Sequence, residues 1–395
     1  MRKAELDLVL ASMLETHQGI SDLIFTVGRP FQVESYGELK AAHVPPYVKA
    51  LTRYQTERMA LNIVGNDKRL LRELLTRGAC DCSYALGDIA RFRVNIFRQR
   101  GNFAIVMRKA QTEMPSLSSL NLPPIFKEIA RERNGLILVT GATGSGKTTT
   151  LSAILNEINE TQAVHVVTLE DPIEFVHQHK RATFNQRELG SDFADFPHGL
   201  RDALRQAPKV ILVGEMRDRA TVEIALTAAE TGHLVLSSIH TINAGQSINR
   251  ILGMFEPSEE AQLRVRLSET LRWAISQRLV PQIGGGRVLI NEIMGSNLRV
   301  RETIAHGETD ARLFYDIVEA SAPYGWTTFD QSLHRAFADD LVTEETADLY
   351  ATNKGRMTRY LDGVKKERGL DENRPTGLRL DPDTAAHGSA SLKIG

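Results

Sequence analysis

One eight-residue segment limits the fold of this chain more than any other. Gly141-Ala-Thr-Gly-Ser-Gly-Lys-Thr148 satisfies the pattern G-x-x-x-x-G-K-[ST], after a short apolar run from Gly135 and before a helix-like run from Thr149. In this strand–loop–helix context, glycines let backbone N–H groups turn inward around phosphate oxygens. The sequence therefore predicts a nucleoside triphosphate site formed by Gly141, Ala142, Thr143, Gly144, Ser145, Gly146, Lys147, Thr148 and Thr149.

Two side chains of this segment supply charge and a metal ligand. Lys147 brings a full positive charge to the phosphates, and the N-terminus of the following helix adds about half a charge. The hydroxyl group of Thr148 is expected to bind Mg²⁺. The predicted cofactors are ATP and Mg²⁺.

Composition narrows the class of protein. The 395 residues suffice for roughly two or three domains, and 48 basic residues nearly balance 49 acidic ones. No excess of positive charge draws the chain to nucleic acid, and no apolar run reaches the ~18 residues of a membrane span. Cys80 and Cys82 fit neither a four-cysteine zinc site nor a C-x-x-C redox pair. We expect reduced thiols and a cytoplasmic location.

The pattern of apolar residues divides the chain into four parts. Residues 1–112 read as a small α+β domain, and 113–124 as a proline- and serine-rich linker. Residues 125–369 alternate helices with apolar strands and end in helices, which predicts an α/β fold with a mostly parallel sheet. Residues 370–395 lose periodicity and are expected to be disordered. The expected strands of the α/β part are 136–140, 164–168, 209–213, 234–239 and 287–292.

Periodicity also gives the elements of the first part. The helices are expected at 6–16, 54–65 and 67–76, and the strands at 22–27, 31–36, 81–86, 90–98 and 103–109.

Acidic residues follow two of the expected parallel strands. Glu215 comes after the apolar run 209–213 and is our candidate for polarising the attacking water, with Gly214 where a magnesium-binding Asp often stands. Glu170 and Asp171 lie at the carboxyl end of another strand, the edge where open α/β sheets bind ligands. The alternatives are a surface carboxylate for Glu215 and a simple turn for Glu170 and Asp171.

Two histidines, His233 and His240, lie at the two ends of one strand that is expected to be buried. Seven residues apart, their side chains point to opposite faces, which argues against a shared metal site. A packing role in the core or a loop is the alternative for each.

Together and in this order, these segments resemble the PilT family of type IV pilus retraction ATPases, within the secretion ATPase superfamily. The resemblance covers residues 5–350 and makes Glu170, His233 and His240 catalytic candidates. It implies a PAS-like N-terminal domain, a RecA-like ATPase domain and a homohexamer. That ring would lie at the inner membrane and use ATP to drive removal of pilin subunits at an inner-membrane platform protein. The matching segments are 91–97, 168–174, 210–218, 227–241, 275–281 and 328–333.

Three arginines of the first part are candidates to approach the nucleotide. Arg91 and Arg93 share one face of strand 90–97, opposite an apolar face, and a solvated basic face is the alternative. The resemblance implies arginine fingers at a subunit interface, which can be worth ~10³–10⁵ in rate. Arg91 and Arg93 are the first choices, and Arg108 in the following strand is the next.

Several related functions remain as alternatives. The segment Leu298-Arg-Val-Arg-Glu-Thr-Ile only partly matches the family's retraction motif, and the sequence does not separate PilT-type from accessory PilU-type members. A second retraction ATPase is therefore a further candidate partner. A pilus-assembly or a type II or IV secretion ATPase is another alternative. Pilus-assembly and type II secretion ATPases typically carry a four-cysteine zinc module, but no cysteine follows Cys82. The balanced charge of the chain argues against a DNA-translocating motor. The presence of Glu215 argues against a regulator that binds ATP without hydrolysing it.

Overall fold

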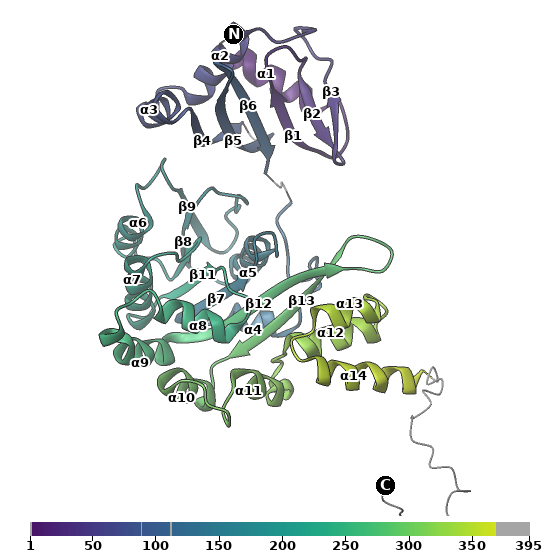
Figure 1. Ribbon diagram of the computed structural model, residues 1–395. Coiled ribbons are helices and arrows are strands. Elements are labelled where there is room, and N and C mark those ends of the chain that lie inside the picture. Colours follow the sequence, from purple (N-terminus) through teal and green to yellow (C-terminus); the bar gives the residue numbers. More distant parts are fainter. Residues whose placement is uncertain (1, 88, 111–112, 369–395) are drawn as a thin grey trace, which may run out of the picture. The chain divides into compact units, whose positions relative to one another are not determined.

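The computed structural model of the protein describes residues 2–87, 89–110 and 113–368 (Figure 1). It divides into two compact units, Met1–Leu279 with Asn291–Thr328, and Val280–Ile290 with Phe329–Gly395. The described segments of the second unit come from the part of the chain that is predicted to form one ATPase domain, 125–369. The predicted boundaries around the linker 113–124 stay predictions, and the predicted disordered tail 370–395 lies outside the described residues.

The first part of the chain forms a six-stranded antiparallel sheet, ordered β3-β2-β1-β6-β5-β4. Helix α2 packs on β6 and α3 packs on β4. Along β5, Phe92, Val94 and Ile96 are fully buried and Arg93 is exposed, which confirms the predicted alternation. The elements are α1 (Lys3–Leu14), β1 (Ile20–Phe25), β2 (Gln32–Ser35), β3 (Glu38–Ala41), α2 (Arg53–Val64), α3 (Lys68–Arg77), β4 (Ala79–Leu86), β5 (Ala90–Gln99) and β6 (Asn102–Lys109).

Both cysteines lie on β4. Cys80 is buried and Cys82 is partly buried. Burial is the largest cause that raises the pKa of the Cys80 thiol to about 11 and that of Cys82 to about 12, and nearby acidic groups add to it. Both side chains are therefore neutral thiols at neutral pH.

The part of the chain after the predicted linker is built on a seven-stranded sheet ordered β13-β12-β7-β11-β10-β8-β9. The pairs from β12 to β9 are parallel, as predicted, and every residue of the inner strand β7 is buried. All five predicted strands are present, and β9 and β12 are two that the sequence pattern did not predict. The strands are β7 (Gly135–Gly141), β8 (His165–Glu170), β9 (Thr183–Glu188), β10 (Val210–Val213), β11 (Leu234–Ile239), β12 (Leu271–Pro281) and β13 (Arg287–Gly295).

Because the strands from β12 to β9 are parallel, their carboxyl ends meet at one edge of the sheet. Helices make most of the connections between these strands, while a loop without a helix joins β8 to β9. That edge carries the segment 141–148 after β7, called the phosphate loop below, together with Glu170 at the end of β8, Glu215 after β10 and His240 after β11. The helices of this unit are α4 (Ile125–Ile129), α5 (Lys147–Thr161), α6 (Phe196–Ala203), α7 (Arg219–Glu230), α8 (Ala244–Leu252), α9 (Glu260–Thr270), α10 (Leu298–His306) and α11 (Phe314–Ala320).

The second unit contains α12 (Phe329–Ala338), α13 (Glu344–Tyr350) and α14 (Lys354–Glu367). Its core includes Val280, Phe329 and Leu333. The fully buried carboxylate of Asp330 accepts hydrogen bonds from the backbone N–H groups of Thr352 (2.6 Å) and Asn353 (2.9 Å), just before α14. The helices predicted at the end of the part 125–369 are present. No helix in the described ranges combines the length and the apolar character that a bilayer crossing needs.

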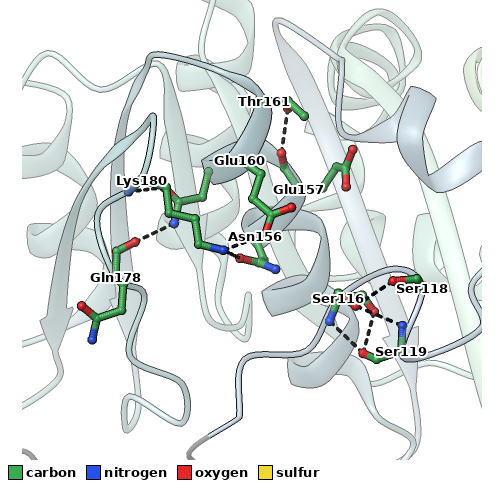
Figure 2. Close-up of polar contacts among 10 residues, drawn as sticks. Ser116, Ser118, Ser119, Asn156, Glu157, Glu160, Thr161, Gln178 and Lys180 are labelled. Carbon is green, nitrogen blue, oxygen red and sulfur yellow. Dashed lines mark hydrogen bonds and ion pairs between the residues drawn. The ribbon is translucent and has the colours of Figure 1, made fainter.

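The loop between β8 and β9 is fastened to α5 (Figure 2). Lys180 Nζ lies 2.6 Å from Glu160 Oε1 and 3.2 Å from Asn156 Oδ1, and Asn159 Nδ2 donates to the Gln178 carbonyl at 2.7 Å. The loop that begins at Asp171 is therefore held against the helix that begins at the phosphate loop. In the predicted linker, Ser116 and Ser119 close a turn by donating backbone N–H groups to each other's hydroxyls (3.0 Å each).

Candidate active site

The phosphate loop joins the end of β7 to the first turn of α5. Gly144 and Gly146 have φ angles of 77° and 90°, which side-chain-bearing residues rarely adopt. Gly141 is constrained by space as well, because a Cβ there would lie 2.4 Å from Ser145 Oγ and 2.6 Å from the Gln277 carbonyl oxygen. The glycines predicted to shape the loop are therefore required by its geometry.

Lys147 lies inside this loop with 8% of its surface exposed. Its Nζ donates to the carbonyl oxygens of Gly141 (3.0 Å) and Ala142 (2.9 Å) and lies 3.5 Å from His240 Nδ1. Burial lowers the pKa of the ammonium group, while the charges of Glu215 and Glu174 oppose that shift. The carbonyl groups hold a cation at the position where the phosphate charge is expected.

A cavity of about 270 Å³ opens over the loop. Half of the predicted site residues border it: four residues of the phosphate loop, the acids Glu170 and Glu215, one histidine and one arginine. Its lining includes Arg93, Thr143, Gly144, Lys147, Thr148, Glu170, Asp171, Glu215, Arg217, Ser238 and His240.

Glu215 and His240 face each other in this cavity. Glu215 Oε2 lies 2.6 Å from Arg217 Nε and 3.6 Å from His240 Nε2. Burial lowers the pKa of His240, and the positive charge of Lys147 lowers it further, whereas Glu215 opposes the shift. A neutral imidazole thus lies between the ammonium group of Lys147 and the carboxylate of Glu215.

Glu170 is a buried acid with 7% of its surface exposed. Its Oε1 atom accepts hydrogen bonds from Thr168 Oγ1 (2.6 Å) and Gln186 Nε2 (3.0 Å). Burial raises the pKa of this carboxyl group to about 7, although both hydrogen bonds oppose the shift. Glu170 is consequently close to half-protonated at neutral pH, unlike an ordinary glutamate.

The three candidate arginines have different surroundings. Arg93 borders the cavity, and its charge opposes the burial that raises the pKa of Asp171. Arg91 NH2 instead binds Glu188 Oε2 at 2.7 Å, and Glu188 is buried in β9.

Arg108 Nε binds the buried Asp22 Oδ1 at 2.9 Å, while 73% of the Arg108 side chain is exposed. It lines a neighbouring cavity of about 470 Å³ together with Arg93, Glu174 and Thr149. Of the three arginines, the structure brings Arg93 to the phosphate-loop cavity. The catalytic roles of all three stay predictions.

His233 lies away from this cavity. It precedes β11, and its Nδ1 atom is 3.0 Å from the Ala228 carbonyl oxygen and 3.3 Å from Thr231 Oγ1. The six residues of β11 separate it from His240, roughly 20 Å at the usual rise of a strand. The structure does not bring His233 to the phosphate loop of its own chain, and its catalytic role stays a prediction.

Three polar residues beside the site were not predicted from the sequence. Arg217 follows Glu215 by two positions, so the strand-end segment contained the signal. Gln186 binds Glu170 from β9, a strand without an apolar pattern. Gln277 lies opposite Gly141 in β12, within the segment 275–281, for which the sequence gives only the resemblance to the family.

Comparisons with known proteins identify the family of this chain. The family model described as "Type II/IV secretion system protein" matches residues 85–313. The type IV pilus retraction ATPase PilT of Pseudomonas aeruginosa is 38% identical over 343 residues, covering 87% of this chain and 97% of that protein. The type IV pilus ATPase PilU of the same species is 34% identical, covering 88% of each chain. A crystal structure of the pilus retraction motor PilT with bound ADP has a TM-score of 0.79 at 36% identity, covering 90% of this chain and 99% of that one.

Proposed function

This chain belongs to the PilT/PilU type IV pilus retraction ATPases, within the type II/IV secretion protein family, and we propose that it works as a homohexamer that hydrolyses Mg²⁺-bound ATP. It is an ATPase of the motor class that retracts pili. The observation that carries the residue assignment is one cavity bordered by Lys147, Glu215 and His240, with the lysine held inside the phosphate loop.

The phosphate loop would hold the triphosphate through its inward N–H groups. Lys147 would then exchange carbonyl partners for β- and γ-phosphate oxygens, whose charge grows during transfer. The burial that lowers the pKa of Lys147 also strengthens its attraction to phosphate, since a drier site screens charge less.

The residues present fit Mg²⁺. The Thr148 hydroxyl would bind the ion, and the carboxylates of Asp171 and Glu215 border the same cavity. Hydroxyl, carboxylate and phosphate oxygens are the ligands that Mg²⁺ prefers. A bound ion supplies positive charge that neutralises the phosphate oxygens.

Glu215 would orient and deprotonate the attacking water. Its carboxylate has an acceptor oxygen, and Arg217 and His240 limit the directions in which it can point. The neutral imidazole of His240 lies near both Lys147 and Glu215. It would therefore couple the binding of phosphate at Lys147 to the position of the Glu215 carboxylate.

Arg93 is our first choice to neutralise charge on the transferring phosphoryl group. It comes from the sheet of the first part of the chain and borders the phosphate-loop cavity. In a closed ring, one repeated heterologous interface would let such an arginine serve a neighbouring subunit. Arg91 and Arg108 remain secondary candidates, because carboxylates bind them here.

The proposed partners follow from the family. The ring would lie in the cytoplasm against the inner membrane, where it would act on a pilus platform protein, and a second retraction ATPase could share that platform. No nucleic-acid partner is expected from a formal net charge of −1.

ATP turnover tests the chemistry. The unaltered protein should release phosphate from ATP, with or without DNA, and Lys147→Ala should lose both nucleotide affinity and turnover. Lys127→Ala removes an exposed lysine of α4 and serves as the matched control. Wild-type turnover that survives in Lys147→Ala would contradict the assignment of the loop.

Gene deletion tests the direction of the motor. Cells that lack a retraction ATPase should carry excess pili and fail to twitch. Cells without pili would instead indicate an assembly ATPase and overturn the retraction role.

A further inference from the structure

Strand β12 runs parallel to β7 and reaches the phosphate loop. Ser276 lies opposite Thr140, and Gln277 lies opposite Gly141, the first residue of the loop. Both β12 residues are buried, Ser276 at 0% and Gln277 at 2% exposure. Because neighbouring side chains on a strand point to opposite faces, the pair contacts two different sets of residues.

Gln277 connects β12 with α5. Its Nε2 atom donates to Thr150 Oγ1 at 2.7 Å and lies 3.4 Å from Asn291 Oδ1. Thr150 is 1% exposed and lies one helical turn after Lys147, where its N–H group donates to the Gly146 carbonyl at 2.9 Å. The same amide side chain therefore holds the first turn of the helix that carries Lys147 and Thr148.

The backbone of Gln277 meets the other end of the loop. Its carbonyl oxygen lies where a Cβ at Gly141 would collide, at 2.6 Å. Gln277 thus contacts Gly141, the first residue of the loop, and through Thr150 it contacts α5, the helix that follows the loop.

Stability alone does not explain an amide at this position. The Oε1 atom of Gln277 is buried and has no hydrogen-bond partner among the residues that the structure describes. An unpaired buried acceptor destabilises a native state, so such atoms in native proteins require another explanation.

We propose that Gln277 is a positioning residue for the phosphate loop, which fixes the first turn of α5 against the strand end that carries Gly141. Lys147 and Thr148 are then presented at a set distance from the opening of the loop. This inference deepens the proposed ATPase function and rests on nucleotide binding in this loop. Gln277 bonds to Thr150 of α5 and is not among the residues that line the phosphate-loop cavity, so its effect passes through Thr150.

The test separates positioning from packing. Gln277→Leu and Thr150→Val remove the hydrogen bond from either side, and Thr150→Ser retains the acceptor hydroxyl. Gln162→Leu is the matched control, because Gln162 Nε2 donates to the Ala130 carbonyl at 2.6 Å just after the other end of α5. For each protein, the Kd of a fluorescent ADP analogue, the KM for ATP, kcat and the melting temperature are measured.

We expect Gln277→Leu and Thr150→Val each to raise the Kd and KM by roughly five- to tenfold, the usual worth of one hydrogen bond. The double variant should be no weaker than either single variant, since both remove the same bond. Thr150→Ser should recover most of the affinity, and Gln162→Leu should change the melting temperature alone.

The proposal is overturned if Gln277→Leu and Thr150→Val lower the melting temperature as Gln162→Leu does while Kd and KM stay at wild-type values. If Gln277→Leu fails to fold, the Thr150→Val and Thr150→Ser pair decides the question. An unaltered protein that binds ADP without hydrolysing ATP would refute the proposed function, yet the ADP affinities would still test Gln277.

Discussion

Replacing Glu170 with glutamine converts the buried carboxyl group beside the phosphate loop into a neutral amide of nearly the same shape. The amide oxygen can still accept the hydrogen bonds from Thr168 and Gln186. What the variant loses is the ability to release a proton. Glu170→Gln therefore isolates the free energy of keeping a charge at this buried position.

The magnitude follows from the pKa. Burial raises the pKa of Glu170 from 4.5 to about 7. Since one pKa unit corresponds to about 1.4 kcal/mol, this interval corresponds to roughly 3 kcal/mol. The native protein binds this proton more tightly than the unfolded chain does. The Glu170 contribution to the free energy of unfolding therefore decreases as pH rises from about 4.5 to about 7, and it is constant above that range.

Urea unfolding of wild type and Glu170→Gln at several pH values between about 5 and 8 measures this contribution. The variant should gain up to roughly 3 kcal/mol of stability relative to wild type as the pH rises across the window. Glu223→Gln, on the exposed face of α7, is the control and should follow wild type at every pH. A wild-type minus Glu170→Gln difference that is constant with pH would refute the reasoning.

The same variant decides what Glu170 does in catalysis. If Glu170 accepts a proton during catalysis, Glu170→Gln should lower kcat by ~10²–10⁴. If Glu170 instead acts as a protonated hydrogen-bonding group, the amide should replace it with little change in kcat. The measured kcat at about pH 7 distinguishes these roles, because the carboxyl group is close to half-protonated there.

Three further predictions concern the loop and its neighbours. Glu215→Gln should retain ATP binding and lower kcat by ~10²–10⁴, because an amide cannot accept the proton of water; unimpaired turnover would remove Glu215 from that role. Gly141→Ala should abolish nucleotide binding, measured by ADP titration, because its Cβ would lie 2.4 Å from Ser145 Oγ. Mixing inactive Arg93→Ala with inactive Lys147→Ala subunits should restore some ATPase activity if the arginine acts across an interface. Mixed rings without activity would exclude that arrangement.

The central strands could be predicted because burial on both faces gives continuous apolar runs. Strands β7, β8, β10 and β11 are of this kind, and the residues at their carboxyl ends follow from the rule for parallel sheets. This explains why Glu170 and Glu215 could be placed at strand ends from the sequence pattern, whereas His240 became a candidate through the family resemblance.

Strand β9 gives no such signal. It lies at the edge of the sheet, and only Phe184 and Glu188 of its six residues are buried. Its polar side chains are explained by their partners, Glu170 for Gln186 and Arg91 for Glu188. Because these partners are distant in sequence, local periodicity carries no information about them.

The contact between Gln277 and Thr150 illustrates the same limit. The two residues are 127 positions apart. In the sequence, a buried glutamine looks like an interruption of an apolar strand. Its contacts can be inferred only when the strand is known to lie beside the phosphate loop. Sequence patterns predict which strands are buried, but the hydrogen bonds between buried polar groups depend on the order of strands in the sheet.

The neutral thiols of β4 make this chain convenient for cross-linking. Thiolates are the reactive species, and with pKa values of about 11 and about 12 the native pair holds few of them at neutral pH. A cysteine introduced on the surface, with an ordinary pKa near ~8.5, would carry a thiolate fraction at least ~10² times larger. Maleimide or disulfide probes should therefore report on contacts between subunits without removal of Cys80 and Cys82.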